Sequence, residues 1–356
     1  MIAIALGTRP EIIKMSPVIR ECERRGLDYF ILHTGQHYSY EMDKIFFEEL
    51  QLPQPDNCLE VGSGTQAEQT ARILSRAEEV LLRERPDIVL VQGDTNSTMG
   101  VALAGAKLGM KVGHVEAGLR SYDRTMPEEI NRVIADHVSD LLFAPTEKAR
   151  LNLRSEGIEK GVTVTGNTIV DAVRQNIDIA EQKVDPMAAM GLEPRKYLLV
   201  TVHRLENVDN RQRLRDILTG LRLVRESLCM PIVFPMHPRT SNMIGTIDVD
   251  LTGITVSQPI GYLAFLRLEA NTALVLTDSG GVQEESCILG VPCVTLRENT
   301  ERPETLDVGS NVISGTDPST ILRMAREMIS RKVTWANPFG DGKAADRIVE
   351  AVADCG

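Results

Sequence analysis

The segment Ser279-Gly280-Gly281 has the residue order of an anion-binding turn. The apolar run Ala273–Leu276 ends just before this turn, and the residues after it are expected to form a helix. The first backbone N–H groups of a helix have no partner within the helix, and the helix dipole adds positive potential behind them. We therefore expect Ser279, Gly280 and Gly281 to bind a phosphate group. A tight turn between a strand and a helix would explain the two glycines equally well.

Ionisable side chains also follow predicted strands in the first half of the chain. Glu116 comes directly after one apolar run, Asp94 comes three residues after another, and Arg9 and Lys14 follow the first apolar run of the sequence. Carboxylates in such places are candidates for general acid–base catalysis, and the nearby cations are suited to a charged substrate.

Two histidines take the same kind of position in the second half. His203 follows the apolar run Tyr197–Val202, and His237 follows the run Ile232–Pro235. Ligands of open α/β sheets bind at the carboxyl ends of the strands. These residues therefore predict an acid–base site beside a phosphate site.

Each of these residues also has a simpler explanation. Asp94 could cap the helix that begins near Thr98, and Glu116 could pair with Arg120 in a solvated turn. The remaining alternatives are a satisfied strand-end histidine at His203, surface charges at Arg9 and Lys14, and dipole-matching side chains at Glu128 and Glu129. The repetition of ionisable residues at strand end after strand end favours a site over coincidence.

The elements that must position these residues alternate between strand and helix along the whole chain. The strand signals are short and continuously apolar, as in buried parallel sheets. The segment 66–85 predicts an amphipathic helix, and the residues expected on its apolar face are Ala67, Ala71, Leu74, Ala77 and Leu81. The pattern stops after Thr165 and restarts at Tyr197.

These repeats predict an α/β protein with two doubly wound, Rossmann-like domains that face each other across a cleft. A length of 356 residues agrees with two domains. We place the N-terminal domain at 1–168 and the C-terminal domain at 169–340. A last helix within 341–356 is expected to pack back on the N-terminal domain.

Composition excludes several classes of function. The net charge of −11 gives no general attraction to nucleic acid or to an anionic membrane. No apolar stretch has the length of a membrane span, and the N-terminus is expected to be a strand and not a signal peptide. The six cysteines are scattered, which favours reduced thiols in the cytoplasm, and the histidines show no metal-ligand spacing.

Seven blocks, in this order along the chain, resemble the non-hydrolysing UDP-N-acetylglucosamine 2-epimerases, which have the two-domain glycosyltransferase-B fold. The blocks are Gly7–Lys14, Gly93–Thr95, His114–Arg120, Pro127–Arg132, His203–Asn207, Asp278–Glu285 and Thr300–Glu304. Each block alone is weak, but all seven in order are highly specific.

The resemblance implies a role for each candidate residue. Ser279, Gly280 and Gly281 would bind the diphosphate of UDP. Other contacts to the nucleotide would come from Glu285 (ribose), Arg9 and Arg302 (phosphate) and Phe265 (uracil), although Phe265 would also suit the core face of a helix. The residues expected around the sugar are Lys14, Asp94, Glu116, Glu128, Arg132, His203 and His237.

The resemblance also implies the reaction. UDP would leave carbon 1 as the carbon 2 proton is removed, a 2-acetamidoglucal would form, and UDP would return after carbon 2 is protonated on the other face. Asp94, Glu116, Glu128 and His203 would supply the proton transfers. UDP-N-acetylglucosamine and UDP-N-acetylmannosamine are the expected partners, with no cofactor or metal, and family members are commonly homodimers. The alternatives are a hydrolysing epimerase, a glycosyltransferase of the same fold and a non-catalytic sensor of UDP-sugars.

Overall fold

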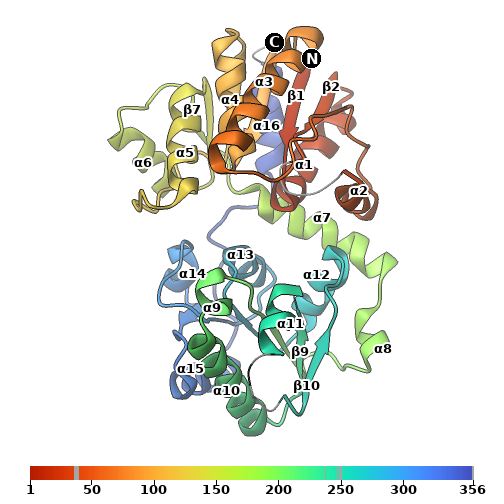
Figure 1. The fold of residues 1–356 in the computed structure, drawn as a ribbon, viewed down its shortest axis with the longest axis vertical. Coiled ribbons are helices and arrows are strands. Elements are labelled where there is room, and N and C mark those ends of the chain that lie inside the picture. Colours follow the sequence, from red (N-terminus) through yellow and green to blue (C-terminus); the bar gives the residue numbers. More distant parts are fainter. Residues whose placement is uncertain (36–39, 237, 246, 248–250, 355–356) are drawn as a thin grey trace. The chain divides into compact units, whose positions relative to one another are not determined.

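The computed structural model describes the chain except residues 36–39, 237, 246, 248–250 and 355–356. His237, one of the predicted sugar-binding residues, therefore lies outside the described residues. Contacts divide the chain into two compact units (Figure 1), Met1–Gln175 with Phe339–Gly356, and Asn176–Pro338. The border falls inside helix α7 (Thr168–Lys183).

The first unit is a seven-stranded parallel sheet with the order β3-β2-β1-β4-β5-β6-β7. Its strands are β1 (Ile2–Leu6), β2 (Tyr29–His33), β3 (Asn57–Cys58), β4 (Ile88–Gln92), β5 (Lys111–Val115), β6 (Leu141–Ala144) and β7 (Val162–Val164). Its helices, besides α7, are α1 (Arg9–Arg25), α2 (Tyr40–Glu49), α3 (Gln66–Glu84), α4 (Asn96–Lys107), α5 (Pro127–Val138), α6 (Glu147–Ser155) and α16 (Ala344–Ala353). The strand order reverses between β1 and β4, which is where a doubly wound sheet opens a ligand site.

The second unit repeats this plan with six parallel strands in the order β10-β9-β8-β11-β12-β13. The strands are β8 (Leu198–Thr201), β9 (Ile232–Pro235), β10 (Ile254–Ser257), β11 (Leu274–Thr277), β12 (Cys293–Thr295) and β13 (Asn311–Ile313). The helices are α8 (Pro186–Met190), α9 (Leu205–Val208), α10 (Arg211–Leu228), α11 (Pro238–Ile244), α12 (Tyr262–Asn271), α13 (Gly280–Ile288), α14 (Pro303–Asp307) and α15 (Pro318–Ser330). Here the order reverses between β8 and β11.

The prediction of two doubly wound α/β domains is confirmed, and the long elements agree with the sequence pattern within a few residues. The strands coincide because their apolar runs are buried from end to end, as in β1 and β4. The predicted apolar face of α3 was wrong in part. Ala67 and Ala71 are exposed, whereas Ile73 and Val80 are buried beside Ala77.

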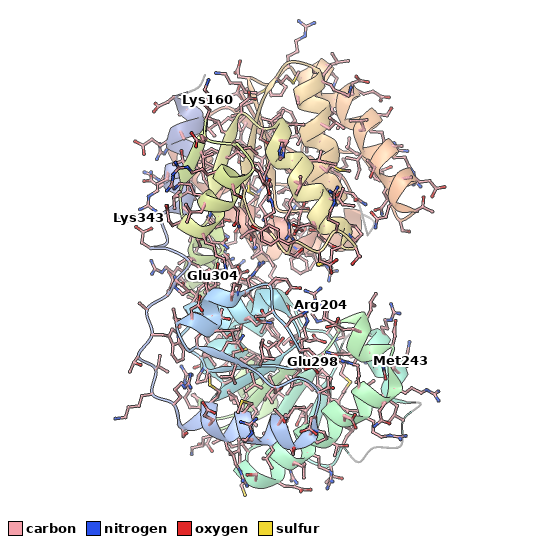
Figure 2. All side chains as sticks on the ribbon, turned by 90° about the vertical axis from the view of Figure 1, so that its left-hand side faces the viewer. Lys160, Arg204, Met243, Glu298, Glu304 and Lys343 are labelled. Atoms are coloured by element: carbon pink, nitrogen blue, oxygen red, sulfur yellow. The ribbon has the colours of Figure 1, made fainter. Side chains whose placement is uncertain are left out.

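Apolar packing holds the helices on the sheets, and charged side chains such as Lys160, Glu298 and Lys343 lie at the surface (Figure 2). In the second unit α10 packs against α15. A Cβ atom on Gly220 of α10 would lie 2.8 Å from Ile321 Cδ1 of α15, so glycine is needed for this close approach. Among the described residues, none of the helices combines the length and apolar character needed to cross a membrane.

The last helix, α16, packs on α1 of the first unit. The carboxylate of Asp171 in α7 accepts the backbone N–H groups of Ala344 (3.2 Å) and Ala345 (3.1 Å), at the start of α16. Asp171 is buried. It therefore satisfies N–H groups that the helix itself leaves without partners.

Replacing Asp171 by Ala should lower the free energy of unfolding of the first unit by about 1–2 kcal/mol, because two buried N–H groups lose their acceptor. Urea denaturation measures the loss, and limited proteolysis should cut first near α16. Asp178→Ala, at an exposed position of the same helix, is the control and should change little. Equal stability of the two variants would contradict this role of Asp171.

Candidate active site

Three neighbouring strands of the first unit end at the predicted acid–base residues. β1 pairs with β4, and β4 pairs with β5, all in parallel. The loops after these strands therefore lie at one edge of the sheet, around its point of reversal. Asp94 and Glu116 lie in the loops after β4 and β5, and Arg9 and Lys14 lie in the first turns of α1, the helix that follows β1.

Glu116 forms a buried ion pair with Lys14. The Lys14 Nζ atom lies 2.7 Å from Glu116 Oε1 and 2.9 Å from Oε2, and the two side chains are 10% and 6% exposed. Gln92 also donates a hydrogen bond to Glu116 Oε2. Neither simpler explanation holds, because Lys14 is not a surface charge and Glu116 does not pair with Arg120 in a solvated turn.

The backbone of Glu116 is left-handed, with φ of 71°. Such a conformation is unfavourable for a residue with a side chain and persists only where the surroundings enforce it. The contacts of its side chain with Lys14 and Gln92 are part of those surroundings.

Asp94 is held by two residues of α5. Arg132 forms an ion pair with Asp94 Oδ2, and the Asn131 side chain donates to the Asp94 carbonyl at 2.9 Å. The proposal that Asp94 caps the next helix was wrong, because α4 begins at Asn96 and its N-cap is Thr95, which accepts the N–H of Thr98. The Asp94 carboxylate is thereby left paired with a cation and partly exposed.

Sequence reasoning gave no role to Glu11, which joins the loops after β1 and β4. Its buried carboxylate accepts hydrogen bonds from the Gly7 N–H (2.7 Å) and from the hydroxyl groups of Thr8 (3.1 Å), Thr95 (2.5 Å) and Thr98 (3.1 Å). Burial raises the pKa of Glu11, although the donated hydrogen bonds oppose that rise. The only sequence signal was its place in the first block.

The surroundings of the Arg9 and Glu128 side chains differ from those of the buried ion pairs described above. The Arg9 guanidinium stacks 4.7 Å from the ring centre of Phe46, in α2, an element that the sequence pattern did not predict. Glu128 is exposed in the first turn of α5. Its neighbour Glu129 is buried and accepts the backbone N–H groups of Ser121 (2.8 Å) and Tyr122 (3.0 Å), so it fixes the loop before α5.

In the second unit, Asp278 fixes the position of His203. β8 and β11 are neighbours, so the residues after them meet at one edge of the sheet. The buried Asp278 carboxylate accepts the backbone N–H groups of His203 (3.1 Å) and Arg204 (3.0 Å) and lies 3.3 Å from the His203 Nδ1 atom. The imidazole of His203 is 47% exposed. The backbone N–H of His203 is hydrogen-bonded, as the simpler explanation expects, while its imidazole ring stays exposed.

The start of α13 has the features of an open anion site. Ser279 is the N-cap, but its side chain makes no capping hydrogen bond. A Cβ atom on Gly280 or Gly281 would meet its nearest neighbour at 3.6 or 3.9 Å, an ordinary contact, and neither glycine has a positive φ. Neither backbone conformation nor packing therefore requires glycine, and close approach of a bound group to the backbone remains as the reason.

The other predicted nucleotide-binding residues surround this helix. Glu285 of α13 is buried and accepts a hydrogen bond from the Tyr262 hydroxyl at 3.0 Å. Arg302 Nε lies 2.9 Å from Glu284 Oε1, also on α13. Phe265 of α12 is half-buried against an apolar cluster of the second unit, so the core explanation fits it as well as a ligand contact does.

A second buried carboxyl group, Glu269 of α12, lies close to Glu285. Its side chain is fully buried, and neither carboxyl oxygen has a hydrogen-bond partner among the described residues. Burial, together with the charge of Glu285, raises the pKa of Glu269 well above its ordinary value. Separately, the described part of the chain holds no group of three or more His, Cys, Asp or Glu side chains that could bind a metal ion.

Comparison with known proteins gives consistent matches along the chain. The family model described as UDP-N-acetylglucosamine 2-epimerase matches residues 20–353. The UDP-N-acetylglucosamine 2-epimerase of Methanocaldococcus jannaschii is 52% identical over 98% of this chain and 97% of its own length. Its crystal structure, in complex with UDP-GlcNAc and UDP, has a TM-score of 0.90 with 99% of both chains covered.

Two further comparisons extend these matches. The UDP-N-acetylglucosamine 2-epimerase of Methanococcus maripaludis is 53% identical over 99% of this chain and 98% of its own. Acinetobacter baumannii MurG has a TM-score of 0.57 at 12% identity, with 99% of both chains covered, which is a likeness of fold alone. The predicted glycosyltransferase-B type of fold is confirmed.

The raised pKa of Glu269 predicts a pH-dependent effect of Glu269→Gln. The folded state holds this proton more tightly than the unfolded state, so the wild type should lose stability as pH rises above the unfolded value of about 4.5. The neutral amide does not titrate, so the variant should gain stability relative to the wild type between pH 4 and pH 8. Denaturation midpoints across this range measure the difference.

Glu181→Gln, at an exposed position of the same unit, is the control and should show no such trend. A difference between Glu269→Gln and the wild type that stays constant with pH would show that Glu269 is ionised in the folded protein.

Proposed function

Because this chain belongs to the UDP-N-acetylglucosamine 2-epimerase family, we propose that it interconverts UDP-N-acetylglucosamine and UDP-N-acetylmannosamine without net hydrolysis. The family match covers most of the chain, and the similar M. jannaschii enzyme was crystallised with UDP-GlcNAc and UDP. The observation that carries the proposal is the pair of charge-neutralised carboxylates, Glu116 with Lys14 and Asp94 with Arg132, at adjacent strand ends of one sheet.

The chemistry of the sugar calls for two proton-transfer groups. The hydrogen on carbon 2 is not next to a carbonyl group, so its direct removal would leave an unstabilised carbanion. Breaking the bond between carbon 1 and the UDP oxygen gives the electron pair of the C2–H bond a destination, the new C1–C2 double bond of a 2-acetamidoglucal. A proton then adds to carbon 2 from the other face, and UDP oxygen re-forms the bond to carbon 1. The reaction leaves the composition of the substrate unchanged, and the hydrogen on carbon 2 is exchanged for one from an acid group of the protein.

The proton-transfer groups in this proposal are drawn from Asp94, Glu116, Glu128 and His203. The ammonium group of Lys14 favours the ionised form of Glu116, which is the form that accepts a proton. Arg132 forms an ion pair with Asp94. Lys14, Arg132 and His237 are also proposed to contact the sugar.

The departing UDP must be stabilised and kept until it returns. The N–H groups of Gly280 and Gly281 at the start of α13, together with the hydroxyl group of Ser279, suit its diphosphate, and the guanidinium groups of Arg9 and Arg302 suit the same charge. The N–H of Ser279 itself donates to the Thr277 hydroxyl at 2.9 Å. Glu285 is proposed to accept the ribose hydroxyl groups, and Phe265 to contact the uracil. The scheme needs no metal or redox cofactor.

Incubation with UDP-N-acetylglucosamine in D2O, followed by NMR, tests the function. We expect UDP-N-acetylmannosamine with deuterium at carbon 2 and little free UDP. Net release of UDP would indicate a hydrolysing epimerase, and turnover only with an added acceptor would indicate a glycosyltransferase.

In the same assay, Glu116→Gln and Asp94→Asn should lower the rate at least about 100-fold while UDP affinity stays within about threefold, because each removes a proton-transfer group. Wild-type rates in both variants would contradict the assignment.

The variant Gly281→Ala should change UDP affinity without lowering the stability of the fold. Because a Cβ atom fits at this position, the variant should be as stable as the wild type or slightly more stable, by up to about 1 kcal/mol. The same methyl group would obstruct the diphosphate, so UDP affinity measured by calorimetry should fall at least about tenfold, equivalent to about 1.4 kcal/mol. Gly245→Ala, which has comparable space, is the matched control. Unchanged UDP affinity in Gly281→Ala would exclude this turn as the phosphate site.

A further inference from the structure

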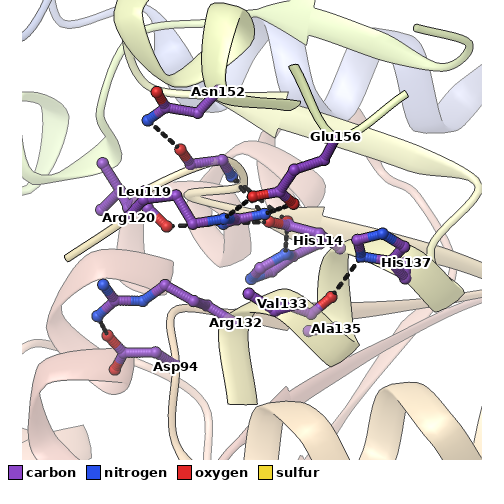
Figure 3. Close-up of polar contacts among 12 residues, drawn as sticks. Asp94, His114, Leu119, Arg120, Arg132, Val133, Ala135, His137, Asn152 and Glu156 are labelled. Atoms are coloured by element: carbon purple, nitrogen blue, oxygen red, sulfur yellow. Dashed lines mark hydrogen bonds and ion pairs between the residues drawn. The ribbon is translucent and has the colours of Figure 1, made fainter. Parts of the chain in front are cut away.

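The buried face of α5 is polar, which is unusual for a helix that covers a sheet. Its buried residues include Glu129, Asn131, Arg132 and Asp136. Asn131 and Arg132 hold the backbone and carboxylate of Asp94, and Figure 3 shows Arg132 directed at Asp94. The role of Asp136, one turn further along the helix, is less obvious because it contacts neither of the proposed acid–base groups directly.

Asp136 is the centre of a buried charge network. Its carboxylate accepts hydrogen bonds from the His114 ring at Nδ1 (2.7 Å) and from the Gly118 N–H (3.2 Å to Oδ2), and it pairs with Arg120 Nη1 at 2.7 Å. Arg120 also donates two hydrogen bonds to Glu156, at 2.7 and 2.6 Å (Figure 3). The side chains of His114, Arg120 and Asp136 are 0–1% exposed, so water does not screen these charges.

The geometry fixes the protonation of His114. Its Nε2 atom lies 2.8 Å from the carbonyl oxygen of Gly93, which can only accept a hydrogen bond, so Nε2 must carry a proton. Its Nδ1 atom faces Asp136, whose other contacts are all donors, so Nδ1 must carry a proton too. This hydrogen-bond geometry favours the doubly protonated imidazolium form of His114. Burial alone would lower the pKa of His114, but Asp136 and its other partners raise it overall.

This imidazolium–carboxylate pair connects the two loops that carry the proposed catalytic carboxylates. At one end His114 binds the carbonyl of Gly93, the residue before Asp94. At the other end Asp136 binds the N–H of Gly118, two residues after the left-handed Glu116. A Cβ atom on Gly118 would lie 2.3 Å from the Ala149 carbonyl oxygen, so this loop has little freedom to shift.

We propose that His114 and Asp136 are positioning residues that hold Asp94 and Glu116 at the separation needed for proton transfer on both faces of carbon 2. This inference rests on the proposed epimerase function. The positive charge of His114 also interacts with Glu116 itself. The other charged groups around the ring are Arg120 and Glu156 beyond Asp136, Lys14 on Glu116, and Arg132 on Asp94.

The primary test is Asp136→Asn in the full-length chain, assayed by carbon 2 deuterium incorporation with UDP-N-acetylglucosamine. We expect kcat to fall about 10- to 100-fold, with KM and UDP affinity within about twofold, because small displacements of catalytic groups have effects of this size. Without its counter-charge the buried His114 should lose a proton within the assay range. The variant's kcat should therefore decline as pH rises, in a step that the wild type lacks, and the step should vanish when His114→Gln is added. Asp346→Asn, a carboxylate of α16 paired with Arg25, is the control.

A second measurement needs no change to the network. Selective ¹⁵N-histidine NMR of the wild type at pH 8 should show one ring with both nitrogens protonated, assigned by its loss in His114→Gln. A neutral His114 at pH 8 would overturn the inference even if Asp136→Asn does not fold. Wild-type kcat and pH profile in a folded Asp136→Asn would also overturn it. If the wild type does not epimerise UDP-N-acetylglucosamine, the proposed function fails, and the NMR result alone decides whether the buried imidazolium exists.

Discussion

The ion pair between Lys14 and Glu116 is the interaction on which the first unit's site depends. A carboxylate removed from water is strongly disfavoured unless a cation or several hydrogen-bond donors meet it. Glu116 lies 7% exposed at the end of β5 and has a left-handed backbone, so without Lys14 it would carry both an unpaired charge and local strain. The pair therefore makes it possible to keep this carboxylate buried inside a folded domain.

The same solution recurs around this sheet edge with different partners. Asp94 is met by Arg132, Asp136 by His114 and Arg120, and Glu11 by four hydrogen-bond donors. In the second unit the Asp278 carboxylate accepts hydrogen bonds from backbone N–H groups and from the side chain of Asn207. The exception is Glu269, whose oxygens lack hydrogen-bond partners among the described residues and whose pKa is raised by burial. Acidic side chains thus accept many of the hydrogen bonds and form many of the ion pairs around the candidate site, in a chain whose net charge is −11.

The two units contribute different physical properties. The first offers side-chain charges in neutral pairs, which suits proton transfer to and from a sugar. The second offers a helix start whose glycines are required neither by packing nor by backbone conformation, which suits a diphosphate. The fold is the same in both units, so these properties come from the segments that follow the strands and not from the sheets.

The sequence predicted the long elements well because buried strands appear as continuous apolar runs, and helices such as α10 carry a clear apolar stripe. It missed α2, the short helices α8, α9, α11 and α14, and the short strands β3 and β13. The short elements have few residues and therefore little periodicity. The candidate residues could be selected from their places after strands, but their partners could not. Lys14 and Glu116 are separated by 102 residues, and no local pattern links His114 to Asp136 or Arg9 to Phe46. Such pairings follow from strand order, which only the folded chain reveals.

A double-mutant cycle on Lys14 and Glu116, measured as the rate of deuterium incorporation at carbon 2, tests the central claim most directly. If the pair acts as one unit, Lys14→Met and Glu116→Gln should each abolish most of the rate, and the double variant should be no slower than the slower single variant. Losses that multiply in the double variant would show that the two side chains act independently and would contradict the account.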